Sequence, residues 1–169
     1  MQYPYTLSKT QHFQIQSPYF PNLKAQGKTK DDALDKYISA VFGEILKAME
    51  NNVAISEGIA GNVKKKNSFT LPMNMALKIK LHNLRLKQNV TKPELARLLS
   101  ITHDDVPDHN WSLENLKTIK PSNPPKYKNS ERLFKIDHES TLREIEQAYR
   151  VLGFNVDVIP YPKRANNAD

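Results

Sequence analysis

The chain has 169 residues, no cysteine, a hydrophobic content of 38% and a net charge of +7. This length suffices for one compact domain or two small ones, and the lack of cysteine excludes disulfides and thiolate metal sites. No apolar run approaches the ~20 residues of a membrane span, and the N-terminus lacks the basic start and apolar core of a signal peptide. We therefore expect a cytoplasmic protein without a membrane partner.

The positive charge is unevenly distributed. Residues 1–62 hold six lysines and six acidic residues, whereas residues 67–169 hold 16 basic and 12 acidic ones. Three consecutive lysines, at 64–66, lie in a glycine-rich stretch (52–68) that we interpret as a linker. Two interpretations of this charge remain open: contact with a polyanion, or an ordinary solvated surface.

Two short strands are predicted at residues 3–8 and 12–17, because Phe13 and Ile15 alternate with glutamines. The break at residues 9–11 indicates a hairpin. Pro18 and Pro21 are expected to interrupt the strand ladder before a third strand at 23–26. Gly27 then turns the chain.

Residues 29–51 are predicted to form the first long helix, with Thr29 as its cap and Asp31 and Asp32 near the positive end of its dipole. Its apolar stripe comprises Ala33, Leu34, Tyr37, Ile38, Val41, Ile45, Leu46 and Met49. Strands followed by a covering helix make a small α+β domain, to which residues 69–71 add a fourth short strand.

The stretch 71–100 predicts two helices. The first is expected to end near Gln88, and its apolar residues are Met73, Ala76, Leu77, Leu81 and Leu84. Thr91 and Glu94 are spaced as a capping box for a second helix that begins near Lys92, with Pro93 in its first turn. This pair is either the opening of a DNA-binding helix-turn-helix or an ordinary αα-hairpin, and the segment alone does not separate the two.

Residues 102–125 do not form a normal recognition helix, because Pro107 would break it and its aspartates would repel phosphates. We interpret this segment as an insertion that carries the only tryptophan, Trp111. The recognition helix is expected to resume near Tyr127, where cations and amides suit phosphates and base edges. The predicted DNA-binding residues are Thr91, Lys92, Lys126, Tyr127, Lys128, Asn129, Ser130 and Arg132.

A last helix is predicted at 140–152, with Gly153 as its terminating C′ residue. Residues 154–159 alternate and predict a final strand. A lone strand is rarely stable, so this strand is expected to pair with a second copy in a dimer.

No sequence motif of a nucleotide-binding or hydrolytic site is present. The densest polar cluster is His103, Asp104, Asp105, Asp108 and His109, for which a metal-dependent nuclease site and a solvated loop are the alternatives. Four N-terminal aromatics, Tyr3, Tyr5, Tyr19 and Phe20, suit a contact surface and core packing equally.

Taken together, the chain resembles the HicB-type antitoxins. The resemblance rests on YPYTL with FQIQSPYFPNL, on Gly27-Lys28-Thr29 before the first helix, on FTLPMNMALKIKLHN, on VTKPELARLLSI, and on RLFKIDHESTLREIEQAYRVLGFNVDV. Asp32 stands where the family usually has glutamate, the glycine usual in the first hairpin turn is missing, and Ser56 stands near a usual proline. The insertion at 102–125 has no counterpart in the family pattern, which puts DNA binding in question.

The resemblance implies an RNase-H-like N-terminal domain (1–60), a linker (61–70), a helix-turn-helix and dimerisation domain (71–160) and a tail (161–169). It implies a non-enzymatic antitoxin and transcription repressor. This protein would neutralise a HicA-type toxin, a small basic mRNA-cleaving ribonuclease, and repress its own operon. The toxin-binding residues would be Tyr3, Tyr5, Tyr19 and Phe20, with operator DNA as second partner, a homodimer or dimer of dimers, and no cofactor. The alternative is a stand-alone helix-turn-helix regulator without a toxin.

Overall fold

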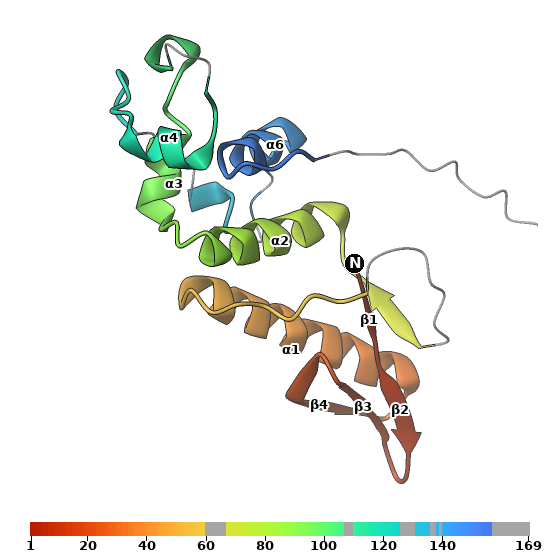
Figure 1. Ribbon diagram of the computed structural model, residues 1–169. Coiled ribbons are helices and arrows are strands. Elements are labelled where there is room, and N and C mark those ends of the chain that lie inside the picture. Colours follow the sequence, from red (N-terminus) through yellow and green to blue (C-terminus); the bar gives the residue numbers. More distant parts are fainter. Residues whose placement is uncertain (60–66, 107–109, 126–130, 136–137, 139, 157–169) are drawn as a thin grey trace, which may run out of the picture.

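The computed structural model describes residues 1–59, 67–106, 110–125, 131–135, 138 and 140–156. It is an α+β protein with small antiparallel sheets and several helices (Figure 1). In chain order the elements are β1 (Gln2–Pro4), β2 (Thr6–Lys9), β3 (Phe13–Ser17), β4 (Phe20–Gly27), α1 (Lys30–Glu50), β5 (Ser68–Thr70), α2 (Met73–Lys87), α3 (Lys92–Leu98), a 3₁₀ turn (His103–Asp105), α4 (Leu113–Thr118) and α6 (Leu142–Val151).

The predicted hairpin is confirmed as the start of an antiparallel sheet with the order β2-β3-β4. Ile15 pairs with Leu7 on one side and with Ala25 on the other. The third strand begins earlier than predicted, because β4 starts at Phe20 and Pro21 lies inside it. The ladder is nevertheless interrupted at Pro21, as expected. A register shift between Gln16 and Ser17 leaves residues 21–23 outside the pairing, so the missing N–H of the proline costs no ladder bond.

The predicted fourth strand is also confirmed, because β5 pairs antiparallel with β1 and places Phe69 opposite Tyr3. The Tyr5 amide donates to the carbonyl of Asn67, which continues this contact past the end of β1. Residues 68–70 thus belong to the N-terminal unit, although they fall within the range predicted as linker.

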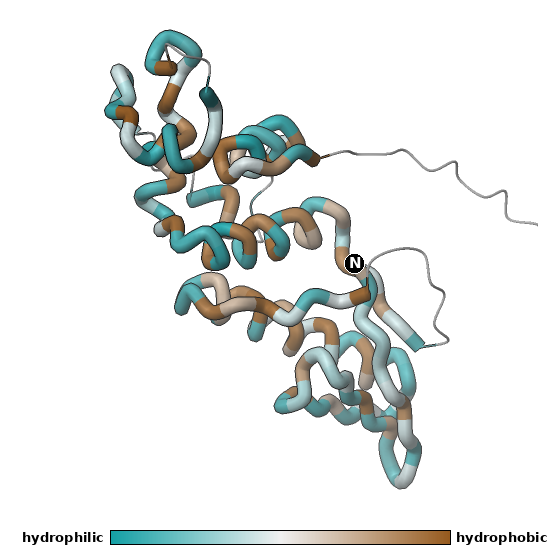
Figure 2. Tube along the Cα trace, in the orientation of Figure 1, coloured by the Kyte–Doolittle hydropathy of each residue, from teal (hydrophilic) through white to brown (hydrophobic). Residues whose placement is uncertain are grey.

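Helix α1 packs along β3 and β4 (Figure 1). The Thr29 hydroxyl accepts from the Asp32 amide at 3.1 Å, as the predicted cap requires. Along α1 in Figure 2, hydrophobic and hydrophilic stretches alternate as in an amphipathic helix. The buried residues of this face are Ala33, Tyr37, Val41, Ile45 and Met49, and only Leu46 of the predicted stripe is exposed.

Helix α2 lies between α1 on one side and α3 and α6 on the other (Figure 1), and it contributes to two hydrophobic cores. Ile79 belongs to the N-terminal core with α1, whereas Leu81 belongs to the C-terminal core with α3 and α6. Both predicted ends of α2 hold within a residue or two, but Met73 is 59% exposed and does not join the apolar stripe. The helix also buries the polar residues Lys78, His82 and Arg85.

Helix α3 begins at the predicted place, with the Glu94 amide donating to the Thr91 hydroxyl at 3.2 Å. The reciprocal half of the capping box is absent among the described contacts. The Glu94 carboxylate instead pairs with Arg97 at 2.7 Å, and this hydrogen bond lowers the pKa of Glu94.

The 102–125 segment, predicted as an insertion, contributes to the C-terminal core through the buried side chains of Val106 and Leu116. The Asp105 carboxylate accepts from the Thr102 amide at 2.8 Å and from the Ser122 hydroxyl, which lowers the pKa of Asp105 to about 2. The segment is therefore closed by its own ends and packed on the domain.

The predicted last helix is confirmed as α6, with a capping box between Thr141 and Glu144. Gly153 has a φ of +85°, and its amide and that of Phe154 donate back into the last turn of α6. This is the Schellman arrangement that favours glycine. Residues 154–156 are not in a strand, and residues 157–159 of the predicted strand lie outside the described part of the chain.

A search of the described helices finds none that is both long and apolar enough to cross a membrane.

Replacing Lys78 by methionine tests how strongly α2 holds the segment after residue 131. The Lys78 ammonium donates to the carbonyls of Arg132, Lys135 and His138 at 3.0, 2.7 and 2.5 Å. Removing a buried donor from these acceptors is expected to lower the free energy of unfolding by about 2–4 kcal/mol. Urea denaturation measures the loss, and Lys80→Met, an exposed position on the same helix, is the control. Equal stability of the two variants would contradict this role.

Candidate functional site

An aromatic cluster lies at the centre of the N-terminal unit. Tyr3 is fully buried, and its ring lies 5.6 Å from Tyr19, 5.1 Å from Phe20 and 5.4 Å from Phe69. The Tyr3 hydroxyl donates to the Ser56 carbonyl at 2.8 Å, and burial raises the pKa of Tyr3 to about 12. The buried Tyr3 ring therefore packs against both Tyr19 and Phe20 and helps to fix their positions. Tyr5 is also buried, with 8% of its surface exposed.

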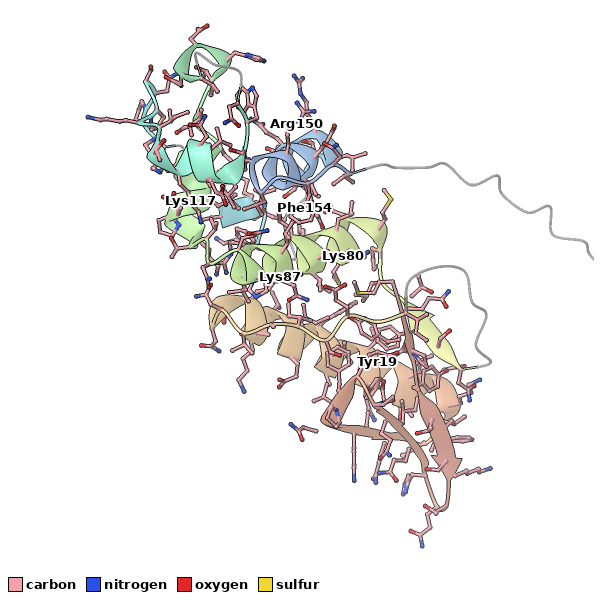
Figure 3. All side chains as sticks on the ribbon, viewed as in Figure 1. Tyr19, Lys80, Lys87, Lys117, Arg150 and Phe154 are labelled. Atoms are coloured by element: carbon pink, nitrogen blue, oxygen red, sulfur yellow. The ribbon has the colours of Figure 1, made fainter. Side chains whose placement is uncertain are left out.

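Tyr19 and Phe20 border an apolar groove of about 250 Å³ between β4, the end of α1 and residues 53–56 (Tyr19 is labelled in Figure 3). Val53 lines the groove and is 56% exposed, which is unusual for an apolar side chain of this size. Glu44 supplies an acidic group to the groove. The groove thus combines exposed apolar surface with one acidic group in its lining.

A basic corner lies where α2 meets α3. A cavity of about 440 Å³ there is lined by Arg85, Thr91 and Lys92 among others. The Arg85 guanidinium donates to the Val90 carbonyl and to the Asn52 side chain, both at 2.7 Å. Burial lowers the pKa values of Arg85 and Lys92, and the charge of Arg85 contributes to the shift of Lys92.

The predicted DNA-binding residues are only partly visible. Thr91 is exposed and caps α3, whereas the Lys92 ammonium donates to the Met49 carbonyl at 2.8 Å and so holds α3 against the end of α1. Arg132 is exposed. The segment around Phe134 lies against the basic corner, since the Lys92 ammonium is 5.8 Å from the centre of the Phe134 ring. The remaining predicted residues, Lys126, Tyr127, Lys128, Asn129 and Ser130, lie outside the described residues.

Sequence analysis missed the buried polar face of α2. Lys78, His82 and Arg85 recur at helical spacing, which is the available signal, but the same spacing is common on exposed helix faces. The His82 side chain donates from Nε2 to the Val53 carbonyl at 2.9 Å, and no carboxylate pairs with it among the described residues. Asn83 exchanges two hydrogen bonds with the backbone of Ile55, at 2.7 and 2.8 Å.

The polar cluster of the 102–125 segment shows no metal-binding geometry where it is visible. Asp105 is engaged by Thr102 and Ser122, and the His103 ring packs on Trp111 with centres 5.1 Å apart. No group of three or more His, Asp or Glu side chains suited to a metal occurs among the residues that the structure describes. Asp108 and His109 lie outside them.

The structure is thus a small α+β protein with an apolar groove on one unit and a basic corner on the other. No protein-family model matches the chain. The chain is similar to the protein named Antitoxin HicB from Pseudomonas fluorescens (strain Pf0-1), with 27% identity over 133 residues. The match covers 79% of this chain and 75% of the relative. The resemblance to HicB-type antitoxins drawn from the sequence is thereby confirmed.

His82 predicts a pH dependence of stability. Burial lowers its pKa from the ordinary value of 6.5, and the cations Arg85 and Lys92 lower it further. The unfolded chain therefore binds a proton at His82 before the folded chain does, so stability is full above pH 6.5 and falls as the pH drops below it. Thermal unfolding between pH 7.5 and 5.5 should show this decline, and His82→Gln should reduce it. His12→Gln, at an exposed position, is the matched control; an unchanged pH profile in His82→Gln would refute the assignment.

Proposed function

We propose that this chain is an antitoxin that neutralises a HicA-type mRNA-cleaving ribonuclease and represses its own operon by binding operator DNA. The observation that carries the proposal is the similarity to Antitoxin HicB, which extends over 133 residues and 79% of this chain. In this proposal residues 1–60 are an RNase-H-like toxin-binding domain. Residues 71–160 are a helix-turn-helix and dimerisation domain that carries an insertion.

The toxin is proposed to dock on the groove beside Tyr19 and Phe20. Its exposed Val53 offers an apolar anchor, and Glu44 complements the positive charge expected of a small ribonuclease that binds RNA. Tyr3 and Tyr5 are buried, so in this proposal they do not contact the toxin directly. They contribute by packing in the core beneath the groove. Of the four predicted aromatics, Tyr19 and Phe20 are thus the direct contacts in this proposal.

Operator DNA is proposed to bind at the opposite unit, along the basic corner and residues 126–132. The exposed Arg132 and Thr91 lie on segments that meet around Phe134 and α3. The proposed dimer uses the chain beyond α6, and the 43% exposure of Phe154 supports an apolar contact there. A stand-alone transcriptional regulator is the second candidate, supported by the same basic corner. It predicts that no small basic toxin is encoded beside this protein.

Charge in the groove is expected to abolish toxin binding selectively. Val53→Asp places a carboxylate in the apolar groove, so the affinity for the co-expressed toxin should fall by ~10-fold or more, as for an interface anchor. Calorimetry or a pull-down with the tagged full chain measures the loss. Leu46→Asp makes the same change at a 37% exposed site on α1 outside the groove and should leave the affinity unchanged. Recovery of DNA fragments but no small basic partner in the wild-type pull-down would favour the stand-alone regulator.

Removing cations from the predicted recognition segment should weaken operator binding without affecting the toxin. Each phosphate contact contributes ~0.9 to the slope of log affinity against log salt, so Lys128→Ala with Arg132→Ala should reduce that slope by about 2. Electrophoretic mobility shifts over a salt series measure it, and Lys47→Ala on α1 is the control. Simultaneous loss of toxin and operator binding would contradict the division into two functional units.

A further inference from the structure

A second cavity, of about 820 Å³, separates the 102–125 segment from α6. His103 and Trp111 line it from the segment, and Arg143, Gln147 and Arg150 line it from α6. None of these residues lines the apolar groove beside Tyr19 and Phe20 or the cavity at the basic corner. Cavities of several hundred Å³ accommodate small-molecule-sized groups, so this one has room for a nucleotide.

One wall of the cavity is aromatic. The Trp111 and His103 rings stand at an interplanar angle of 69° with centres 5.1 Å apart, in an edge-to-face arrangement. Trp111 is only partly buried and lines the cavity, so part of its ring surface remains for a further flat group. Trp111 is only partly buried while it packs against the C-terminal core, which holds its ring in place.

The other wall is cationic. Arg143 and Arg150 are seven residues apart on α6 and therefore share one face of the helix, with Gln147 between them. Arg143 forms no ion pair with any described residue, and Arg150 projects from α6 (Figure 3). The single acidic group on this wall, Glu146, lies 3.4 Å from Arg150 in a pair that is 65% and 47% exposed. An exposed pair of this kind is weak, and a phosphate can replace its carboxylate.

The segment that carries the aromatic wall is held firmly. The Arg97 guanidinium donates to the carbonyls of Leu116 and Lys117, each at 3.2 Å, and also to that of Ile119. Ser122 is bound to Asp105 across the base of the segment. The cavity walls are thus fixed before a ligand arrives, which lowers the entropic cost of binding.

We propose that this cavity binds a nucleotide of a single-stranded nucleic acid, with its base stacked on Trp111 and its phosphates held by Arg143 and Arg150. Aromatic rings beside guanidinium groups are the usual composition of such sites, because every base has a stackable face and every linkage has a negative charge. Gln147 and Thr102 supply hydrogen-bonding groups at the same cavity. The inference stands apart from toxin neutralisation and operator binding, which use other surfaces.

The test uses the fluorescence of Trp111, the single tryptophan of the chain, which reports directly from the cavity. The full-length protein is titrated with oligothymidylate, with oligouridylate and with adenosine monophosphate at low salt, under selective excitation of the indole. Saturable quenching is expected with the oligonucleotides, and its midpoint should rise steeply with salt. Quenching by oligouridylate alone would identify RNA as the source, and equal quenching by both would identify the shared nucleotide chemistry.

Two variants retain the reporter. Arg143→Gln and Arg150→Gln should each weaken oligonucleotide binding several-fold and lower its salt dependence, whereas Lys47→Gln removes the same charge from α1 and should change nothing. Trp111→Leu should weaken binding on the order of ten-fold when it is followed by the anisotropy of a labelled oligonucleotide. Its thermal unfolding shows whether the variant is folded.

Absence of quenching by all three probes, or quenching that Arg143→Gln and Arg150→Gln leave unchanged, would overturn the proposal. Because double-stranded operator is absent from these titrations, failure here leaves operator repression unaffected. Failure of operator binding leaves this site equally unaffected.

Discussion

The structure depends on the buried donors of α2. Lys78, His82, Asn83 and Arg85 each contact a backbone carbonyl outside α2, at 2.5–3.0 Å for Lys78 and 2.7–2.9 Å for the others. All of these carbonyls except that of Arg132 lie outside helices and strands. Backbone carbonyls of irregular segments have no strand or helix partner, and in a protein interior they must be satisfied. One helix therefore satisfies carbonyls of Val53 and Ile55 on one side and of Arg132, Lys135 and His138 on the other. A buried cation is tolerated here because several acceptors surround it.

This arrangement makes the two units one structure rather than two tethered ones. Ile79 and Leu81 are neighbours on α2, yet they belong to different cores. Lys92 adds a bond from α3 to the end of α1, and the Tyr149 hydroxyl donates to the Leu77 carbonyl at 2.9 Å from α6. Helix α2 therefore contributes side chains to the cores of both units.

The 102–125 segment is packed into the C-terminal domain through both apolar and polar contacts. Val106 and Leu116 complete the C-terminal core, and polar bonds close the segment at Asp105 and Arg97. Its packing on α6 creates the cavity bordered by Trp111, a surface that lies away from the α2–α3 corner. The segment therefore forms one side of this cavity. It does not lie between α2 and α3, which are joined by four residues between Lys87 and Lys92.

By itself the sequence determined the elements whose causes are local. The Thr29 cap, the apolar period of α1, the Thr91 and Thr141 caps and the terminating Gly153 act within a turn or two, so each element was predicted near its observed bounds. The tertiary structure alone decided which polar residues are buried and which aromatics are exposed. Tyr3 is in the core because β1 pairs with β5, some 65 residues away, and Lys78 is buried because the carbonyls of Arg132, Lys135 and His138 surround its ammonium. The periodicity of side chains predicts which residues share one face of a helix or strand. It does not predict what packs against that face, because the packing partner comes from a distant part of the sequence.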